Sequence, residues 1–448
     1  MTDTLALGSP WAPYGLRDDP FFQLALQPTT DTAAPRPITL FVGRDKELAR
    51  VANQILGSSN SRAILEGDAG VGKTSFVSRL KTELGKHGVL MHAQPVRVRP
   101  GMSAREFVAE VLQVHLQIRA TVAANEAGGA LRKAGRAVKK EALGALADPE
   151  TVFWRRVGRL VHGEDSTSTG LSAGVPLVNI GAQREQVRIP AEVDGLSLFT
   201  ELEHAVNYLT QSGKRKLLIH VNNLEQLSIE NAASAAHLMQ QVRDYLLVDY
   251  CHWLFVGTTG VEELVFRASE QVSGIIPFAV ALEPLAPREV LEILERRYAH
   301  LRMGLRFTAP ITPEDGATLY ERYHGQLRSF LRLLSRAVQD RATYAPGTTL
   351  SVDEVIASMA PTLRREALIK RIGEADTEHL ARTFGGRRFD AEIRVSDLVT
   401  ANRITQASAS KLMRRLLDKK IIRQSRTQGK SVFYRLAEGD ITVALNLG

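Results

Sequence analysis

The chain has 448 residues, which is too long for one hydrophobic core of ordinary size and predicts two or three domains. Its 44% hydrophobic and 24% charged residues are typical of a globular protein, and its single cysteine, Cys251, excludes a disulfide framework and a cysteine-rich zinc site. The net charge of +8 comes from residues 361–448, which hold 18 Lys and Arg against 10 Asp and Glu. A basic region of this kind is either a solvated face or the contact surface for a polyanionic partner, nucleic acid first.

The beginning of the chain, MTDTLALGSPWAPYG, lacks the basic start and apolar core of a signal peptide. No apolar run approaches the ~20 residues that a membrane helix needs. We therefore expect a cytoplasmic protein with no membrane partner, in which residues 1–40 form an N-terminal lead-in segment. Taken alone, the stretch FVGRDKEL at 41–48 has one simple structural interpretation, a loop followed by a helix N-cap at Asp45.

Residues 62–80, RAILEGDAGVGKTSFVSRL, contain the spacing G-x-x-x-x-G-K-[ST] of a phosphate-binding loop, or P-loop. An apolar strand, AILE, precedes the loop and a helical pattern follows it. The glycines let the backbone curl so that its N–H groups face phosphates, and the helix N-terminus adds its dipole. Lys73 would reach the β and γ phosphates and Thr74 would bind Mg²⁺, so ATP and Mg²⁺ are the predicted cofactors. The predicted nucleotide contacts in this stretch are Gly67, Asp68, Ala69, Gly70, Val71, Gly72, Lys73, Thr74 and Ser75.

Much of the remaining chain before residue 360 alternates between predicted strands and helices. Buried strands are predicted at 88–98 (GVLMHAQPVRV), 216–221 (KLLIHV) and 251–256 (CHWLFV). Helical periodicity covers 103–124, 196–213, 290–301 and 325–342. Continuous apolar strands that alternate with helices predict an α/β fold with a parallel sheet.

Residues 125–194 look like an insertion into this pattern. A helix rich in Ala, Lys and Arg is predicted at 130–147, and a loose β-hairpin at 166–190. The basic cluster of the helix is either a solvated face or a contact with DNA or a neighbouring subunit; it comprises Arg132, Lys133, Arg136, Lys139 and Lys140.

The sequence FVGR-x-x-E-L at 41–48, the P-loop and the motifs described below resemble an AAA+ ATPase of the origin-recognition-like and STAND-like group. The resemblance covers nearly the whole chain, with an AAA+ core at 41–283, a helical lid at 284–360 and a winged helix at 361–448. It implies that Val42, Gly43 and Arg44 lie beside the adenine. DDPFF at 18–22 also resembles the lead-in often found in these proteins.

In related ATPases the strand at 216–221 ends in two carboxylates. The first holds Mg²⁺ through water, and the second orients or deprotonates the attacking water. Here Asn222 and Asn223 take those positions, and Glu225 is the nearest carboxylate. Because an amide carries no charge and is no base, we expect ATP binding with slow hydrolysis, as in a nucleotide-held switch rather than a rapid motor.

Three further site residues follow from the resemblance. Thr258 in FVGTTG would be a polar sensor near the γ phosphate, with a strand cap as the alternative. Arg328 in HGQLRSFLRLL would be the lid contact to the phosphates, with a surface arginine as the alternative. Arg267 in VFRASEQVSG would be an arginine finger supplied to a neighbouring subunit, which requires oligomers.

The basic end of the chain shows the order helix, turn, helix, β-hairpin that is typical of a winged helix. A helix and turn are predicted at 394–405, a second helix at 406–422 and two strands within 421–436. The apolar positions expected to pack inward are Ala407, Leu412, Met413, Leu416 and Leu417. The outer face and the hairpin would contact double-stranded DNA through Ser408, Lys411, Arg414, Arg415, Lys419, Arg426, Lys430 and Arg435.

We therefore predict an ATP-binding switch ATPase that binds double-stranded DNA and assembles with itself or with partner proteins. One alternative is a STAND-type signalling or defence ATPase whose winged helix contacts protein. Another is a transposition-regulator ATPase that recruits a nuclease or transposase. Salt-dependent binding of DNA would separate the first and third functions from the second.

Overall fold

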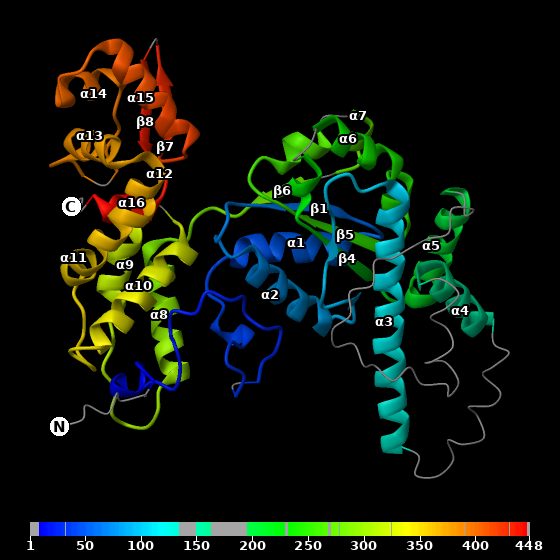
Figure 1. Cartoon of the computed structure of the whole chain (residues 1–448). Helices are drawn as coiled ribbons and strands as arrows, with labels where there is room; N and C mark the ends of the chain where they lie inside the picture. The colour runs from blue at the N-terminus through cyan, green and yellow to red at the C-terminus, as the bar shows by residue number, and fades with distance from the viewer. Residues whose placement is uncertain are drawn as a thin grey trace. The chain divides into compact units, whose positions relative to one another are not determined.

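The computed structural model describes residues 9–31, 33–133, 149–162, 195–228, 232–267, 270–276, 278–323, 325–388, 390–429 and 431–445. Most of the predicted insertion helix, including Arg136, Lys139 and Lys140, and the hairpin expected at 166–190 lie outside these residues. The chain divides into two units (Figure 1). The sheet unit comprises Arg44–Asp68 and Phe76–Leu282, and the lid unit comprises Met1–Gly43, Ala69–Ser75 and Glu283–Gly448.

The sheet unit contains a parallel β-sheet, which confirms the predicted α/β class. Its strands are β1 (Arg62–Glu66), β2 (Leu90–Met91), β3 (Val96–Arg97), β4 (Leu217–Asn222), β5 (Cys251–Val256) and β6 (Phe278–Ala281). Their order is β2-β4-β5-β1-β6, and β3 also pairs with β4. Every pairing is parallel. This order places the carboxyl end of β1 beside that of β5, and the carboxyl end of β5 beside that of β4.

The single strand predicted at 88–98 is wrong, because the structure has two short strands there, β2 and β3. The Lys81 ammonium, on the helix that follows the P-loop, donates hydrogen bonds to the carbonyls of His92 (2.6 Å) and Ala93 (3.1 Å). These carbonyls are therefore bound to a side chain instead of a neighbouring strand. Such a tertiary contact leaves no signal in the local hydrophobic pattern.

Helices surround the sheet and form one hydrophobic cluster with its central strands. Leu217–Val221 of β4 and all six residues of β5 are buried, as expected for parallel strands covered on both faces. Phe107 stacks on Trp253 with ring centroids 6.2 Å apart, and Trp253 stacks on Phe255 at 6.1 Å. The helices of this unit are α1 (Asp45–Gly57), α2 (Lys73–Lys86), α3 (Ala104–Lys133), α4 (Pro149–His162), α5 (Gly195–Thr210), α6 (Ala232–Gln241) and α7 (Glu270–Ser273).

The lid unit combines the N-terminal lead-in with four helices: α8 (Pro287–Leu301), α9 (Pro313–Glu321), α10 (Leu327–Ala342) and α11 (Val352–Leu363). The DDPFF stretch is bound to these helices. Arg297, which is buried, donates to the carbonyls of Pro20 and Phe22 at 3.0 Å and lies 3.9 Å from the centroid of the Phe22 ring. Phe21 is fully buried in the lid core. The lead-in therefore belongs to the lid core.

The C-terminal region continues from the lid with the predicted order of helices and hairpin. Its elements are α12 (Lys370–Ile372), α13 (Glu374–Phe384), α14 (Val395–Asn402), α15 (Gln406–Asp418), β7 (Ile422–Gln428), β8 (Ser431–Leu436) and α16 (Gly439–Ala444). On α15, Leu412, Met413 and Leu416 are buried as predicted. Ala407 is exposed, however, and Ala409 takes the expected inward place. The reason is helical spacing, since positions 409, 412, 413 and 416 share one face whereas 407 lies off it.

Among the residues described, no helix is both long and apolar enough to span a membrane.

Two buried histidines of the sheet unit predict a loss of stability in acid. Burial lowers the pKa of His115 and His252 to about 4, and each ring has one hydrogen bond, to Val111 O and Ser61 Oγ respectively. The unfolded chain takes up protons near pH 6.5 whereas the fold does not, so the free energy of unfolding falls as the pH drops from about 6.5 toward 4. For His115 the loss between pH 7 and pH 5 is about 2 kcal/mol.

Urea unfolding at pH 7 and pH 5 measures this loss, and His115→Leu should reduce it by that amount. His87→Leu, at an exposed position, is the control and should leave it unchanged. An equal pH dependence in His115→Leu and the unmodified chain would contradict the assignment.

Candidate functional site

The P-loop lies at the carboxyl end of a buried strand and at the start of a helix. β1 ends at Glu66, α2 begins at Lys73, and the intervening residues form the turn. Gly70 and Gly72 have φ angles of +85° and +104°, a left-handed conformation that favours glycine. Lys73 and Thr74 begin α2, where backbone N–H groups have no partner within the helix. This arrangement of N–H groups, a cation and a hydroxyl suits a phosphate group with its metal ion.

The turn after β5 is bonded to the end of β1 and to the P-loop. The backbone N–H of Gly257 donates to Leu65 O at 3.1 Å. The Glu66 carboxylate accepts from the N–H groups of Gly260 (3.3 Å) and Glu262. Glu66 is the last residue of β1 and immediately precedes the P-loop. Its two hydrogen bonds therefore hold the turn after β5 next to the start of the P-loop.

A threonine of this turn contacts the P-loop directly. The Thr259 hydroxyl donates to Asp68 Oδ1 at 2.8 Å. The sequence candidate, Thr258, is the half-buried neighbour, whose backbone carbonyl accepts from Val261. Sequence reasoning missed Thr259. The only available signal was the second threonine of FVGTTG, since the geometry of the turn decides which side chain faces Asp68.

The two asparagines lie at the carboxyl end of β4. Asn222 is the last residue of the strand, and its Oδ1 accepts a hydrogen bond from the Asn223 N–H at 2.9 Å. Asn223 has φ +65°, a left-handed conformation that asparagine tolerates better than most residues. Glu225 is half-buried in the following 3₁₀ turn, Leu224–Ser228. The strand therefore ends in amides, and its nearest following carboxylate lies in a different local conformation.

The first turn of α10 lies against the P-loop. A Cβ atom added at Gly70 would be 2.9 Å from Cβ of Arg328. Arg328 itself is exposed. The sequence candidate for a lid contact is thus adjacent to the tip of the P-loop.

The turn at Val42, Gly43 and Arg44 has two consecutive left-handed residues, with φ +71° at Gly43 and +68° at Arg44. Val42 is buried, and a Cβ atom at Gly43 would overlap Oε1 of Glu289 at the start of α8. Glu289 also accepts from the Ala286 N–H at 2.7 Å. This geometry requires glycine at position 43.

The arginine-finger candidate is held by its own chain. Arg267 donates from Nε (3.1 Å) and Nη2 (3.0 Å) to Glu262 Oε1, and its side chain is 58% exposed. The hydrogen bond to Glu262 raises the pKa of the guanidinium. Arg267 also lines a surface pocket with Arg50 and Phe278. The bond to Glu262 uses Nε and Nη2 and leaves Nη1 out of this contact.

The predicted DNA-contacting residues are distributed over α15 and the hairpin. Exposed residues on α15 are Ser408, Lys411, Arg414 and Arg415, and Lys419, the residue after the helix, is exposed as well. Arg415 pairs with Asp376 at 2.8 Å. Arg426 pairs with Glu392 at 2.7 Å and lies 4.1 Å from the centroid of the Phe433 ring. Arg435 is half-buried on β8, and Lys430 lies outside the described residues.

Within the described ranges, no group of three or more His, Cys, Asp or Glu residues could hold a metal ion. The Thr74 hydroxyl is the P-loop group that fits a Mg²⁺ ion, which usually keeps several waters and shares nucleotide phosphates as ligands.

Residues 40–248, just under half of the chain, match the family model of the AAA ATPase domain. This match includes the P-loop and both asparagines. Together with the parallel sheet and its surrounding helices, it shows a P-loop AAA+ fold. No curated protein matches the chain.

Similar solved structures include a Walker-type ATPase of Pyrococcus abyssi, with 12% identity, 96% of this chain and 100% of that chain covered, and a TM-score of 0.45. Another is the ORC2 protein of Aeropyrum pernix in ADPNP-ADP complexes, with 14% identity, coverage of 96% and 97%, and a TM-score of 0.47. The ORC1 protein of Aeropyrum pernix in complex with DNA shows 15% identity, coverage of 91% and 92%, and a TM-score of 0.40. With TM-scores below 0.5, these similarities assign no function to the chain.

Proposed function

We propose that the protein is an ATP-binding switch ATPase that hydrolyses ATP slowly and binds double-stranded DNA through a C-terminal winged helix. The observation that carries this proposal is a complete P-loop in its strand–turn–helix setting, combined with asparagines at the end of β4. The P-loop supports nucleotide binding, and the asparagines account for slow nucleotide cleavage.

ATP binding rests on the P-loop. Lys73 contacts the β and γ phosphates, and the N–H groups at the start of α2 bind the remaining phosphate oxygens. The Thr74 hydroxyl would hold Mg²⁺, and the ion would supply neutralisation of the phosphate charge. Val42, Gly43 and Arg44 contact the adenine, and Arg328 reaches the phosphates from α10. The proximity of Arg328 to Gly70 supports this last assignment.

Slow hydrolysis follows from the amides at Asn222 and Asn223. A general base typically contributes ~10²–10⁴-fold to a rate, and neither amide can accept the proton of the attacking water. Asn222 also binds its own backbone, at the Asn223 N–H. Glu225 is the nearest carboxylate in this segment and supplies charge only if the turn after β4 rearranges.

DNA binding rests on the exposed face of α15. Lys411 and Arg414 are exposed, and they lie in a region whose net charge supplies the whole +8 of the chain. Thr405 caps the helix by accepting from the Ser408 N–H at 3.2 Å. A basic helix with a fixed start fits the major groove, and cations on the hairpin reach phosphates. The protein assembles with itself or with a partner, with Arg267 as the contact in trans.

A second candidate is a STAND-type signalling or defence ATPase whose winged helix contacts protein. The observation that favours it is the pairing of Arg415 with Asp376 and of Arg426 with Glu392, which neutralises part of the basic face. A third function, transposition regulation, needs the same DNA contact plus a recruited nuclease or transposase.

Asn222→Asp should raise ATP turnover by at least about 10-fold, because it restores a charge where related enzymes hold Mg²⁺. Steady-state phosphate release measures the change. Asn207→Asp adds the same charge at an exposed position of α5 and should leave turnover unchanged. No gain in Asn222→Asp would mean that a missing charge at this position does not limit hydrolysis.

Reversing Lys411 and Arg414 to Glu should weaken the binding of duplex DNA at least about 10-fold and reduce the dependence of log K on log salt by about 2. Fluorescence anisotropy over a salt series gives both quantities. Arg288→Glu with Arg306→Glu is the matched control, because these exposed lid residues change the net charge equally. Equal losses in both double variants would assign the effect to net charge and reject the α15 contact.

A further inference from the structure

The last helix of the described chain, α16, is packed between the lid helices and the C-terminal hairpin. Every residue from Gly439 to Ala444 is buried. The helix contacts α10, α11 and the π-helical turn Arg364–Ile369 on the lid side, and β8 on the other. A Cβ atom at Gly439 would overlap the ring of Tyr323, so the chain enters α16 in direct contact with the lid.

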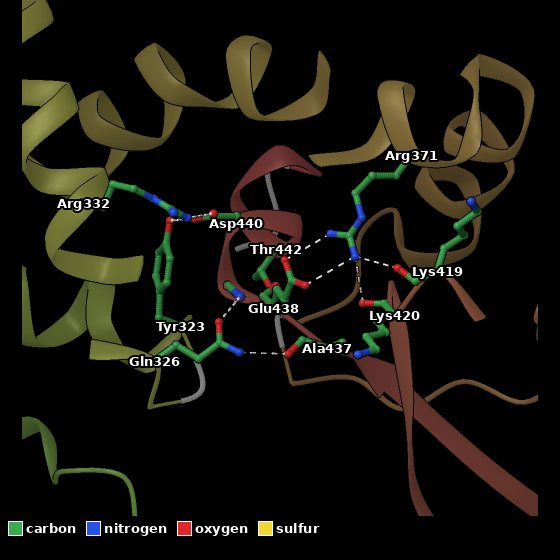
Figure 2. A network of polar contacts seen from close by, with 11 residues as sticks. Tyr323, Gln326, Arg332, Arg371, Lys419, Lys420, Ala437, Glu438, Asp440 and Thr442 are labelled. Carbon is green, nitrogen blue, oxygen red and sulfur yellow. Dashed lines mark hydrogen bonds and ion pairs between the residues drawn. The ribbon is translucent and has the colours of Figure 1, made fainter. Parts of the chain in front are cut away.

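Polar side chains around the start of α10 hold the turn that leads into α16. Figure 2 shows Asp440 between two of them. The Tyr323 hydroxyl donates to Asp440 Oδ1 at 3.0 Å, and Arg332 Nη2 donates to Oδ2 at 2.6 Å. Asp440 is 9% exposed and Tyr323 is fully buried, whereas the Arg332 side chain is 48% exposed. Gln326 adds two bonds: its amide donates to Ala437 O at 3.1 Å and accepts from the Gly439 N–H at 3.3 Å.

The same turn is connected to the end of α15 through one arginine. Arg371 donates from Nη1 to Glu438 at 3.1 Å. From Nη2 it donates to the carbonyls of Lys419 (2.6 Å) and Lys420 (3.4 Å), as Figure 2 shows. We call residues 437–440, together with Tyr323, Gln326, Arg332 and Arg371, the C-terminal latch.

The stretch 323–332 contacts both the latch and the P-loop. Tyr323 and Gln326 lie just before α10, and Arg332 lies one turn after Arg328, whose Cβ approaches Gly70. A displacement of the first turn of α10 would therefore also displace Tyr323, Gln326 and Arg332, which hold Asp440 and its turn.

We propose that the C-terminal latch transmits the nucleotide state of the P-loop to the DNA-contacting face of α15. The inference rests on the proposed function, in which Arg328 contacts the phosphates and α15 contacts DNA. A phosphate that draws Arg328 toward the P-loop moves the start of α10. Asp440 is largely buried and accepts hydrogen bonds from Tyr323 and Arg332, and losing them would leave its carboxylate with unsatisfied oxygens, so α16 moves with α10. Arg371 and Glu438 extend this movement to Lys419, at the end of α15.

Because nucleotide binding and DNA binding are thermodynamically linked, the effect of one ligand on the affinity for the other measures the proposed transmission. The coupling factor is the ratio of the dissociation constants of labelled duplex DNA without and with the non-hydrolysable analogue ADPNP, measured by anisotropy on the full chain. We expect a factor of about 10 in the unmodified protein, within the usual range for coupled sites. Arg332→Met and Arg371→Met should each bring it to about 2 or less, while ADPNP affinity without DNA changes by less than about 3-fold.

Arg341→Met is the matched control. Arg341 lies on the same helix, pairs with Glu354 at 3.2 Å and takes no part in the latch, so its loss should leave the coupling factor unchanged. Should Arg332→Met fail to fold by circular dichroism, Tyr323→Phe removes one hydroxyl from the latch and should also lower the factor.

The proposal would be overturned if the folded Arg332→Met and Arg371→Met variants had the same coupling factor as the unmodified protein. A coupling factor of 1 in an unmodified protein that binds both ligands would also overturn it, a result that leaves the proposed function standing. Failure of the unmodified protein to bind ADPNP or DNA would instead reject the proposed function itself.

Discussion

The backbone turn between β1 and α2 is the constraint on which the rest of the structure depends. β1 is paired on both sides, with β5 and β6, so its carboxyl end cannot shift without disturbing the sheet. The left-handed glycines at 70 and 72 then set the direction in which α2 leaves. Within the sheet unit, Thr259 is bonded to Asp68 in this turn. Within the lid unit, Arg328 lies against Gly70.

The asparagines at the end of β4 divide the chemistry of such a loop into two parts. Electrostatic attraction between Lys73, the helix N-terminus and a triphosphate does not depend on β4. Activation of the attacking water does depend on the end of β4, where this chain has the amides of Asn222 and Asn223. We propose that a protein with this division holds its nucleotide for long periods, as a switch does. In this proposal the latch between α10 and α16 is the output of the switch, because it joins the lid to the region that carries the excess positive charge.

The sequence predicted those parts of the fold that local chemistry determines. The P-loop spacing, the apolar strands at 216–221 and 251–256 and the helical pattern of α15 depend on neighbouring residues, and the structure has a turn, two strands and a helix there. The candidate Arg328 also proved to be adjacent to the P-loop. Contacts made by tertiary structure were missed. The division of residues 88–98 into two strands depends on Lys81, the Thr259 contact depends on the shape of a turn, and the lead-in is fixed by the buried Arg297. Tyr323 and Asp440 are 117 positions apart, and no pattern in either segment indicates their bond.

The most direct test of the account is calorimetric titration of nucleotide-free protein with ATP and Mg²⁺. We expect saturable binding of one ATP per chain. We also expect a folded Lys73→Ala variant to bind ATP at least about 10-fold more weakly, because the substitution removes the charge that faces the phosphates. An unmodified protein that binds no ATP, or a Lys73→Ala variant with unchanged affinity, would contradict it.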